Sequence, residues 1–345
     1  MSGTPFLTKN TAYIIAEAGV NHNGDITKAL CLVDEAKKSG ADAVKFQTFI
    51  AAQLISKEAK MADYQKENIG KETSQLEMIK QFELSFADFV VIKEYCDKVN
   101  IQFLSTPFDY ESVDFIDSLV PFFKISSGEI TNYPFLKYIA KKKKPIILST
   151  GMSTLSEVEK ALDVLTNEGC KDIVLLHCTT NYPCPYDEVN LNAMQTIRDA
   201  FKLPVGYSDH TLGIEVPIAA VTMGAKVIEK HFTLDKNLLG PDHKASLDPQ
   251  ELAEMVKAIR NIESALGDGI KKPNQSELEV MSVARKSLVA TRDLKANEIV
   301  KESDIAIKRP GNGIKPEYID VVLGKKLLRD VEEDELLSWE CFFQL

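Results

Sequence analysis

The strongest constraint on the fold is a succession of eight short apolar runs, separated by longer amphipathic segments, within the first 270 residues. Near-continuous apolar runs are typical of parallel strands that are covered on both faces. Strand–helix units of this number and length match an α/β fold of the (β/α)8 TIM-barrel type. The runs are AYIIAEAG (12–19), ADAVKFQT (41–48), IQFLSTPF (101–108), FFKISSGE (122–129), PIILSTGM (145–152), DIVLLHCT (172–179), PVGYSDH (204–210) and KVIEKHF (226–232).

Helix start and stop signals lie between the predicted strands. Gly40 follows an amphipathic stretch as a C-cap. Thr154 begins a Thr-x-x-Glu capping box, and Asp248 precedes a proline at the first position of another helix. The polar segment 49–75 interrupts the regular spacing, and we interpret it as an inserted active-site loop before two helices.

The chain is predicted to contain a barrel domain over residues 1–270, a linker over 271–282 and a small domain over 283–345. Gly, Lys and Pro cluster in GDGIKKPNQSE (267–277), which is typical of a linker. A domain of roughly 60 residues buries little surface by itself. We therefore expect it to pack on the barrel or on another subunit.

Composition argues against several classes of partner. The net charge of −10 disfavours nucleic acid and anionic membranes, because both require a basic face. No apolar run approaches the roughly 18 residues of a membrane helix, and the N-terminal MSGTPFLTKN lacks a signal-peptide pattern. The six cysteines form no C-x-x-C pair, which favours free thiols in a reducing compartment. We expect a cytoplasmic enzyme.

Polar and charged residues gather at the C-terminal ends of the apolar runs. In a barrel these ends converge on the face that carries the active site. A packed core would not place charges there, because a buried charge without a partner is strongly unfavourable. The residues are Glu17, Lys45, Gln47, Ser105, Thr106, Lys124, Ser127, Glu129, Ser149, Thr150, His177, Thr179, Ser208, Asp209, His210, Glu229 and His231.

His210 and His231 end two neighbouring predicted strands, and we interpret them as ligands of one divalent metal. Two imidazoles leave the other positions to water and substrate, which suits a catalytic ion rather than a structural zinc. For His22, His177 and His243, a structural role and a role near the site stay open.

Lysines and hydroxyls at the same strand ends predict a phosphate site. Lys45 and Lys124 would supply positive charge, while Glu17 and Glu129 would supply acceptors or a general base. The hydroxyl donors are Thr106, Ser127, Ser149 and Ser208. Together with the metal, these groups indicate addition to a phosphorylated small molecule.

Ten short motifs follow one another along nearly the whole chain. They are IAEAGVNHNG (15–24), VKFQT (44–48), FLSTPFD (103–109), KISSGEITNYP (124–134), ILSTGM (147–152), LLHCTTNYP (175–183), GYSDHT (206–211), EKHFTLDK (229–236), GPDH (240–243) and KRPGNG (308–313). As a set they resemble the sialic acid (nonulosonic acid) synthase family, and residues 283–345 are similar to its SAF, or antifreeze-like, domain.

The resemblance implies condensation of phosphoenolpyruvate with an open-chain N-acetylated mannose-type sugar and water, giving a nine-carbon 2-keto acid and phosphate. It implies that Glu17 stabilises the cationic intermediate or activates the water. It also implies a divalent metal on His210 and His231, with manganese favoured over magnesium or cobalt, which polarises the sugar aldehyde. The implied phosphoenolpyruvate contacts are Lys45, Thr106, Lys124, Ser127, Ser149 and Ser208.

The sugar contacts implied by the resemblance are Gln47, Glu129, Thr180, Tyr182, Asp242 and Arg309. In the family the arginine covers the N-acetyl group and comes from the partner subunit of a domain-swapped homodimer. Thr180 stands where some N-acetylneuraminate synthases carry asparagine. AEAGVNHNGD, CTTNYP and GPDHKASL look closest to the legionaminic acid branch. The favoured acceptor is 2,4-diacetamido-2,4,6-trideoxymannose, and N-acetylmannosamine, which gives N-acetylneuraminate, is the alternative.

Two other hypotheses are weaker. An aldolase or condensing enzyme that uses an arabinose or erythrose phosphate would need a second phosphate cluster beyond Lys45 and Lys124. A non-catalytic sugar-binding protein is conceivable because antifreeze-like modules exist outside enzymes. The acidic, metal-binding and phosphate-binding groups of the barrel weigh against it.

Overall fold

The computed structural model describes residues 7, 11–56, 58, 59, 61 and 74–344 of the chain. The chain divides into two compact units, Met1–Gly267 and Asp268–Leu345, which are described separately below. Over the described residues, no helix combines the length and the apolar character needed to span a membrane.

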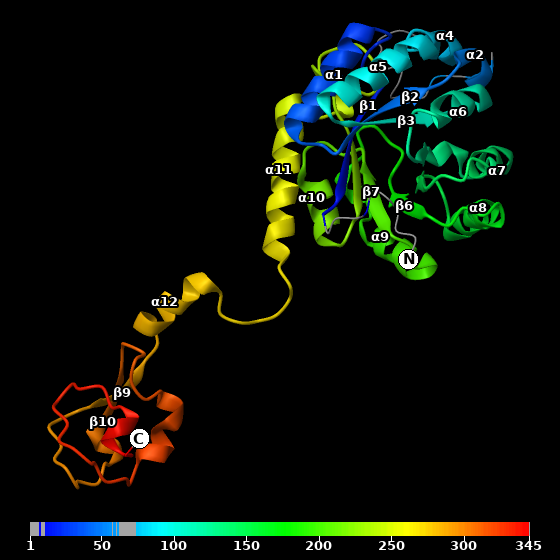
Figure 1. Cartoon of the computed structure of the whole chain (residues 1–345). Coiled ribbons are helices and arrows are strands. Elements are labelled where there is room, and N and C mark those ends of the chain that lie inside the picture. The colour runs from blue at the N-terminus through cyan, green and yellow to red at the C-terminus, as the bar shows by residue number, and fades with distance from the viewer. Residues whose placement is uncertain (1–6, 8–10, 57, 60, 62–73, 345) are drawn as a thin grey trace. The chain divides into compact units, whose positions relative to one another are not determined.

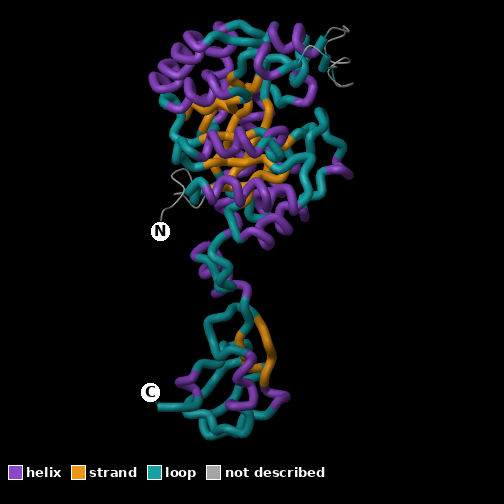
Figure 2. Tube along the Cα trace, turned by 90° about the vertical axis from the view of Figure 1, so that its right-hand side faces the viewer, coloured by secondary structure: helices purple, strands orange, loops and turns teal. Residues whose placement is uncertain are grey.

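Eight parallel strands form a nearly closed barrel in the first unit (Figures 1 and 2). Their hydrogen-bonded order is β3-β2-β1-β8-β7-β6-β5-β4, so the first and last strands of the barrel pair with each other. The strands are β1 (Tyr13–Gly19), β2 (Ala43–Thr48), β3 (Gln102–Pro107), β4 (Phe123–Ile125), β5 (Ile146–Ser149), β6 (Ile173–His177), β7 (Val205–Asp209) and β8 (Val227–His231). Each predicted apolar run contains one of these strands, which confirms the predicted barrel.

Helices surround the barrel strands in Figure 2, and several begin or end at the predicted signals. Gly40 ends the first helix with a left-handed φ of 82°, which a residue without a Cβ adopts readily. Thr154 and Asp248 each form a capping box with a glutamate three residues later. The helices are α1 (Ile26–Ser39), α2 (Ala51–Leu54), α4 (Gln75–Lys80), α5 (Phe86–Val99), α6 (Tyr110–Asp117), α7 (Tyr133–Ala140), α8 (Leu155–Asn167), α9 (Asn192–Phe201), α10 (Glu215–Thr222) and α11 (Pro249–Leu266).

The insertion after β2 is anchored near the end of β1. Phe49, Met78 and Phe82 pack in one buried cluster with Val20, which directly follows β1. The segment expected to be a loop includes the short helix α2 and ends where α4 begins. The rest of that prediction falls partly on residues 57, 60 and 62–73, which lie outside the described residues.

The alternation of side chains along each strand decides which residues enter the barrel. Ile15, Val174 and Val227 belong to the apolar cluster that fills the barrel interior. Two positions further along β1 and β8, the inward side chains are Glu17 and Glu229. The interior is therefore apolar at one end and polar at the carboxyl ends of the strands.

The second unit has its own small core. It contains α12 (Gln275–Ala284), β9 (Ser287–Ala290), β10 (Ile305–Lys308) and α13 (Ile319–Val322). Leu288, Val300 and Leu337 are among its fully buried residues. From Gln275 onward the segment predicted as a linker is helical, because Asn274 and Glu277 form a capping box.

Candidate active site

The inward-facing ends of the barrel strands line one polar cleft. It contains eleven of the predicted site residues: Glu17, Lys45, Gln47, Thr106, Lys124, Ser127, Ser149, Tyr182, Ser208, His210 and His231. They come from eight strands or the turns just after them, so no short stretch of sequence could form the site alone.

Two lysines and two glutamates form a buried charge cluster at the base of this cleft. Lys45 Nζ lies 2.7 Å from Glu17 Oε2 and 3.7 Å from Glu229 Oε2. Lys124 Nζ lies 3.4 Å from Glu229 Oε1. Thr106 Oγ1 accepts from Lys45 Nζ at 2.9 Å. A phosphate or carboxylate entering the cleft would therefore meet two ammonium groups that are already held in place.

The two glutamates differ in their pKa values. Burial raises the pKa of Glu17 to about 7, the ammonium of Lys45 opposes this rise, and the charge of Glu229 adds to it. Burial also disfavours the ionised form of Glu229, but Lys124 and Lys45 outweigh it and lower the pKa of that carboxyl. One carboxylate thus stays ionised between the lysines, while the other titrates near neutrality.

His210 and His231 lie beside each other with their ring centroids 5.5 Å apart. His210 Nδ1 is 2.6 Å from the carbonyl oxygen of Thr179. Because a carbonyl only accepts, Nδ1 carries the proton, and Nε2 keeps its lone pair for another partner. Burial lowers the pKa of both histidines, which keeps the rings neutral, as metal binding requires.

The residues present fit a metal that is completed by water and substrate. His231 Nδ1 is buried and makes no hydrogen bond within the described residues. Asp242 Oδ2 lies 3.7 Å from this nitrogen. Across the described ranges no group of three or more His, Cys, Asp or Glu side chains forms a ready metal cage.

Tyr182 and Gln47 flank this part of the cleft. The Tyr182 ring lies 4.1 Å from that of His210 and 5.5 Å from that of His231, measured between centroids. Gln47 Nε2 donates to Glu17 Oε1 at 3.4 Å. The tyrosine therefore lies beside the two histidines, and the glutamine lies beside Glu17 of the charge cluster.

Four predicted sugar contacts, Glu129, Thr180, Asp242 and Arg309, are not among the residues that line the cleft. Asp242 is buried beside His231. Glu129 is half-buried and accepts from Asn132 Nδ2 at 2.7 Å. Thr180 is exposed in the loop after β6. Arg309 is exposed in the second unit, in the segment that follows β10.

The remaining histidines are held by bonds of their own. His22 Nδ1 accepts from Gly24 N at 3.1 Å, and burial lowers the pKa of this histidine to about 4. His177 Nε2 donates to the carbonyl of Val189 at 2.8 Å. His243 bonds through both ring nitrogens, to Thr233 and to Asn23. None of these three side chains is among the residues that line the cleft.

The cleft also contains residues to which the sequence analysis assigned no metal, substrate or catalytic role. They are Phe108, Ser126, Cys178 and Glu229. Glu229 was recognisable as a strand-end residue, and its spacing of two from His231 was a signal that both face inward. Its contacts with both lysines were not visible in the sequence, because Glu229, Lys45 and Lys124 lie on three different strands.

A barrel that buries two lysines and two glutamates in a cleft at the carboxyl ends of its strands is built for catalysis, since an inert core would exclude them. The fold and the cleft therefore define an enzyme of the (β/α)8 class that handles small anionic substrates.

Within that class the chain belongs to the NeuB family, which matches residues 32–271, and residues 285–342 match the SAF domain. It is 55% identical to the N,N'-diacetyllegionaminic acid synthase of Campylobacter jejuni, over 94% of this chain and 98% of that one. It is 51% identical to the enzyme of the same name from Legionella pneumophila, over 96% and 94% of the two chains.

A solved structure has the same fold. The N-acetylneuraminic acid synthetase of Leptospira borgpetersenii superposes with a TM-score of 0.68 and is 36% identical, over 79% of this chain and 90% of that one. These comparisons confirm the predicted resemblance to sialic acid synthases.

Proposed function

We propose that this enzyme condenses phosphoenolpyruvate with 2,4-diacetamido-2,4,6-trideoxymannose and water, releasing phosphate and a legionaminic-acid-type 2-keto acid. The observation that carries this proposal is the buried Lys45–Glu17–Glu229–Lys124 cluster at the base of the cleft. The identity of 55% to a diacetyllegionaminic acid synthase supports the choice of acceptor sugar.

The lysines and hydroxyls of the cleft are assigned to phosphoenolpyruvate. Lys45 and Lys124 would face its anionic groups, which places the enol carbon toward the sugar. Glu17 would stabilise the positive charge that develops at the phosphate-bearing carbon, or accept a proton from the attacking water. The hydroxyls assigned to the same substrate are Thr106, Ser127, Ser149 and Ser208.

A divalent metal, manganese by preference, is part of the proposal. His210 and His231 would hold it, with Asp242 close by, and a metal bound there would polarise the sugar aldehyde. Gln47, Glu129, Thr180 and Tyr182 would contact the sugar.

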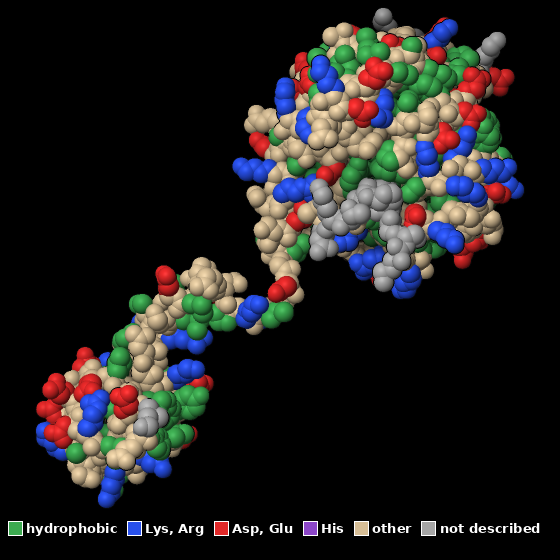
Figure 3. All heavy atoms as spheres, in the orientation of Figure 1, with side chains coloured by type: hydrophobic (Ala, Val, Ile, Leu, Met, Phe, Trp, Pro, Cys, Tyr) green, Lys and Arg blue, Asp and Glu red, His purple; other side chains and the backbone are tan. Residues whose placement is uncertain are grey.

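We propose a homodimer in which Arg309 of one copy covers the sugar bound to the other copy. Helix α12 supports this, because it has no buried residue although Leu278, Val280 and Val283 are apolar. Hydrophobic side chains are visible on the surface of this helix in Figure 3. An apolar helix face of this kind is typical of a protein interface.

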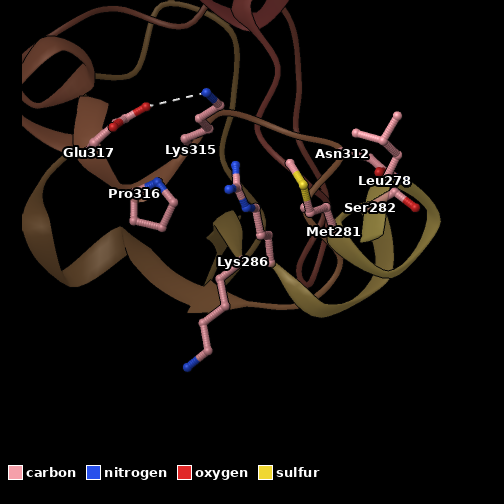
Figure 4. A pocket seen from close by; sticks show the side chains of 10 residues that line it. Leu278, Met281, Ser282, Lys286, Asn312, Lys315, Pro316 and Glu317 are labelled. Atoms are coloured by element: carbon pink, nitrogen blue, oxygen red, sulfur yellow. Dashed lines mark ion pairs between the residues drawn. The ribbon is translucent and has the colours of Figure 1, made fainter. Parts of the chain in front are cut away.

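A hollow of about 660 Å³ adjoins the same helix within the second unit (Figure 4). Leu278 and Met281 of α12 lie on one side of it, and the ion pair of Lys315 with Glu317 lies on the other.

A cytoplasmic location is also proposed, and the six free cysteines support it.

The deciding experiment is a competition assay with mass-spectrometric detection of products. The enzyme receives phosphoenolpyruvate with equal amounts of N-acetylmannosamine and the 2,4-diacetamido sugar. We expect mainly the diacetylated nine-carbon product, with one phosphate released per product. A majority of N-acetylneuraminate would overturn the sugar assignment, and phosphate release without any sugar-derived product would overturn the condensation itself.

A further inference from the structure

A second buried ion pair lies on the outward face of the barrel, behind the two histidines of the site. Asp209 and Lys230 are register partners on β7 and β8, and Lys230 Nζ lies 2.5 Å from Asp209 Oδ2. Both side chains are 0% exposed. One position earlier, the inward partners Ser208 and Glu229 share a hydrogen bond of 3.0 Å. The two strands are therefore tied together on both faces at the same height.

Thr211 connects this pair to the turn after β7. Lys230 Nζ donates to the Thr211 carbonyl at 2.5 Å. In return, Thr211 N and Oγ1 donate to Asp209 Oδ1 at 3.1 and 2.9 Å. These bonds fix the backbone on both sides of residue 210. The ring of His210 makes its own hydrogen bond, from Nδ1 to the Thr179 carbonyl.

Stability alone does not explain an ion pair at this position. Taking two charges out of water offsets most of their attraction, and apolar side chains of similar volume often stabilise a core equally well. The neighbouring outward residues Tyr207 and Ile228 belong to the apolar cluster between strands and helices. Neither Asp209 nor Lys230 is among the residues that line the cleft.

We propose that Asp209, Lys230 and Thr211 are positioning residues that fix His210 and His231 in the arrangement that binds a divalent metal. This inference rests on the proposed metal site. Metal–ligand distances tolerate deviations of only about 0.2 Å, so two ligands on separate strands need a rigid connection. The ion pair supplies that connection because each partner directly precedes one of the histidines.

The test measures binding of Mn²⁺ alone to the full-length protein by electron paramagnetic resonance, beside the affinity for phosphoenolpyruvate. The double variant Asp209→Leu with Lys230→Met replaces the pair by apolar side chains of similar size. We expect its Kd for Mn²⁺ to rise about tenfold or more, as for other residues that orient metal ligands. Saturating Mn²⁺ should restore most of the activity.

Two comparisons separate this role from general loosening of the fold. The Kd for phosphoenolpyruvate should rise much less than that for Mn²⁺, because of its assigned contacts only Ser208 lies beside the replaced pair, while Lys45 and Lys124 lie on other strands. Arg260→Met breaks the 2.8 Å pair with Asp42 at the opposite end of the barrel. That control should lower the Tm and leave the Mn²⁺ affinity unchanged.

A folded double variant that binds Mn²⁺ like the wild type would overturn the proposal, and so would an equal loss of affinity for both ligands. Failure of the wild-type protein to bind Mn²⁺ would overturn the metal site as well, which distinguishes the two failures. If the double variant does not fold, the Kd for Mn²⁺ is measured on Thr211→Val instead. This variant removes the hydroxyl that bonds to Asp209 but keeps the ion pair. We expect it to weaken Mn²⁺ binding about threefold, and an unchanged affinity contradicts the inference.

Discussion

Glu17 and Lys45 are register partners on β1 and β2, and their side chains form an ion pair of 2.7 Å inside the cleft. The pKa of Glu17 nevertheless lies near 7, because burial outweighs the attraction of the lysine. Lys45 is therefore held in position by a carboxyl that can change its charge at neutral pH. That combination suits a lysine that binds an anionic substrate next to a group that moves protons.

We predict that the ionised form of Glu17 is the active one. As the pH falls through about 7 the carboxylate of the free enzyme becomes protonated, so kcat/KM should decline on the acidic side and level off above it. Glu17→Gln should lower kcat by about 10²- to 10⁴-fold while phosphoenolpyruvate still binds. Steady-state kinetics across pH checks this, and an acidic limb that persists unchanged in the variant would assign it to another group.

Glu229→Gln should destabilise the free protein by about 3 kcal/mol, because Lys45 and Lys124 lose the carboxylate between them. Inorganic phosphate should recover part of this loss by taking the carboxylate's place. Urea denaturation with and without phosphate measures both effects. Glu129→Gln is the matched control, since that residue is half-buried and should cost about 1 kcal/mol or less. Equal losses in the two variants would argue against the lysine cluster.

Gly151→Ala should weaken phosphoenolpyruvate binding about tenfold through steric pressure on the cleft. An added Cβ would lie nearest to Thr180 Oγ1, then 2.9 Å from Cys178 Sγ and 3.0 Å from Ser127 Oγ, so these side chains must shift. Gly128→Ala is the control, because its Cβ would meet nothing nearer than Ser126 Oγ at 3.9 Å. Fluorescence or calorimetric titration with phosphoenolpyruvate decides. Similar affinities in both variants would contradict the steric explanation.

Arg309→Ala should raise the KM for the sugar about tenfold or more and leave that for phosphoenolpyruvate nearly unchanged. The arginine is exposed in its own unit and is proposed to act on the sugar of the other copy. Arg329→Ala removes an arginine of the same unit that pairs with Glu335, and it should affect neither constant. Mixing Arg309→Ala with Glu17→Gln protein adds a second measurement. Partial recovery of activity is expected in the mixed dimer if the arginine acts between subunits.

The barrel could be predicted because its signal is local. Apolar runs such as DIVLLHCT carry the strand, and Gly40 and Thr154 mark helix ends within a few residues. The sequence predicted a linker over 271–282, but the structure has helix α12 from Gln275 onward. The capping box of Asn274 and Glu277 starts this helix just after a stretch of linker-like composition. Much of the site followed from the same local rule, since polar residues at strand ends converge in any such barrel.

The sequence alone thus determined much of the cleft, because the two-residue period of a strand places residues such as Glu17, Lys45 and Ser208 on the inward face before any packing is known. It did not separate them from Asp209, which lies at the end of the same strand as Ser208 but faces outward. Tertiary structure decided their partners and charges. Glu17 and Glu229 are the same residue type at equivalent strand ends, yet the pKa of one is raised and that of the other lowered. The difference comes from burial and from the positions of Lys45 and Lys124 on other strands, and electrostatic energy depends on distances that exist only after the barrel closes.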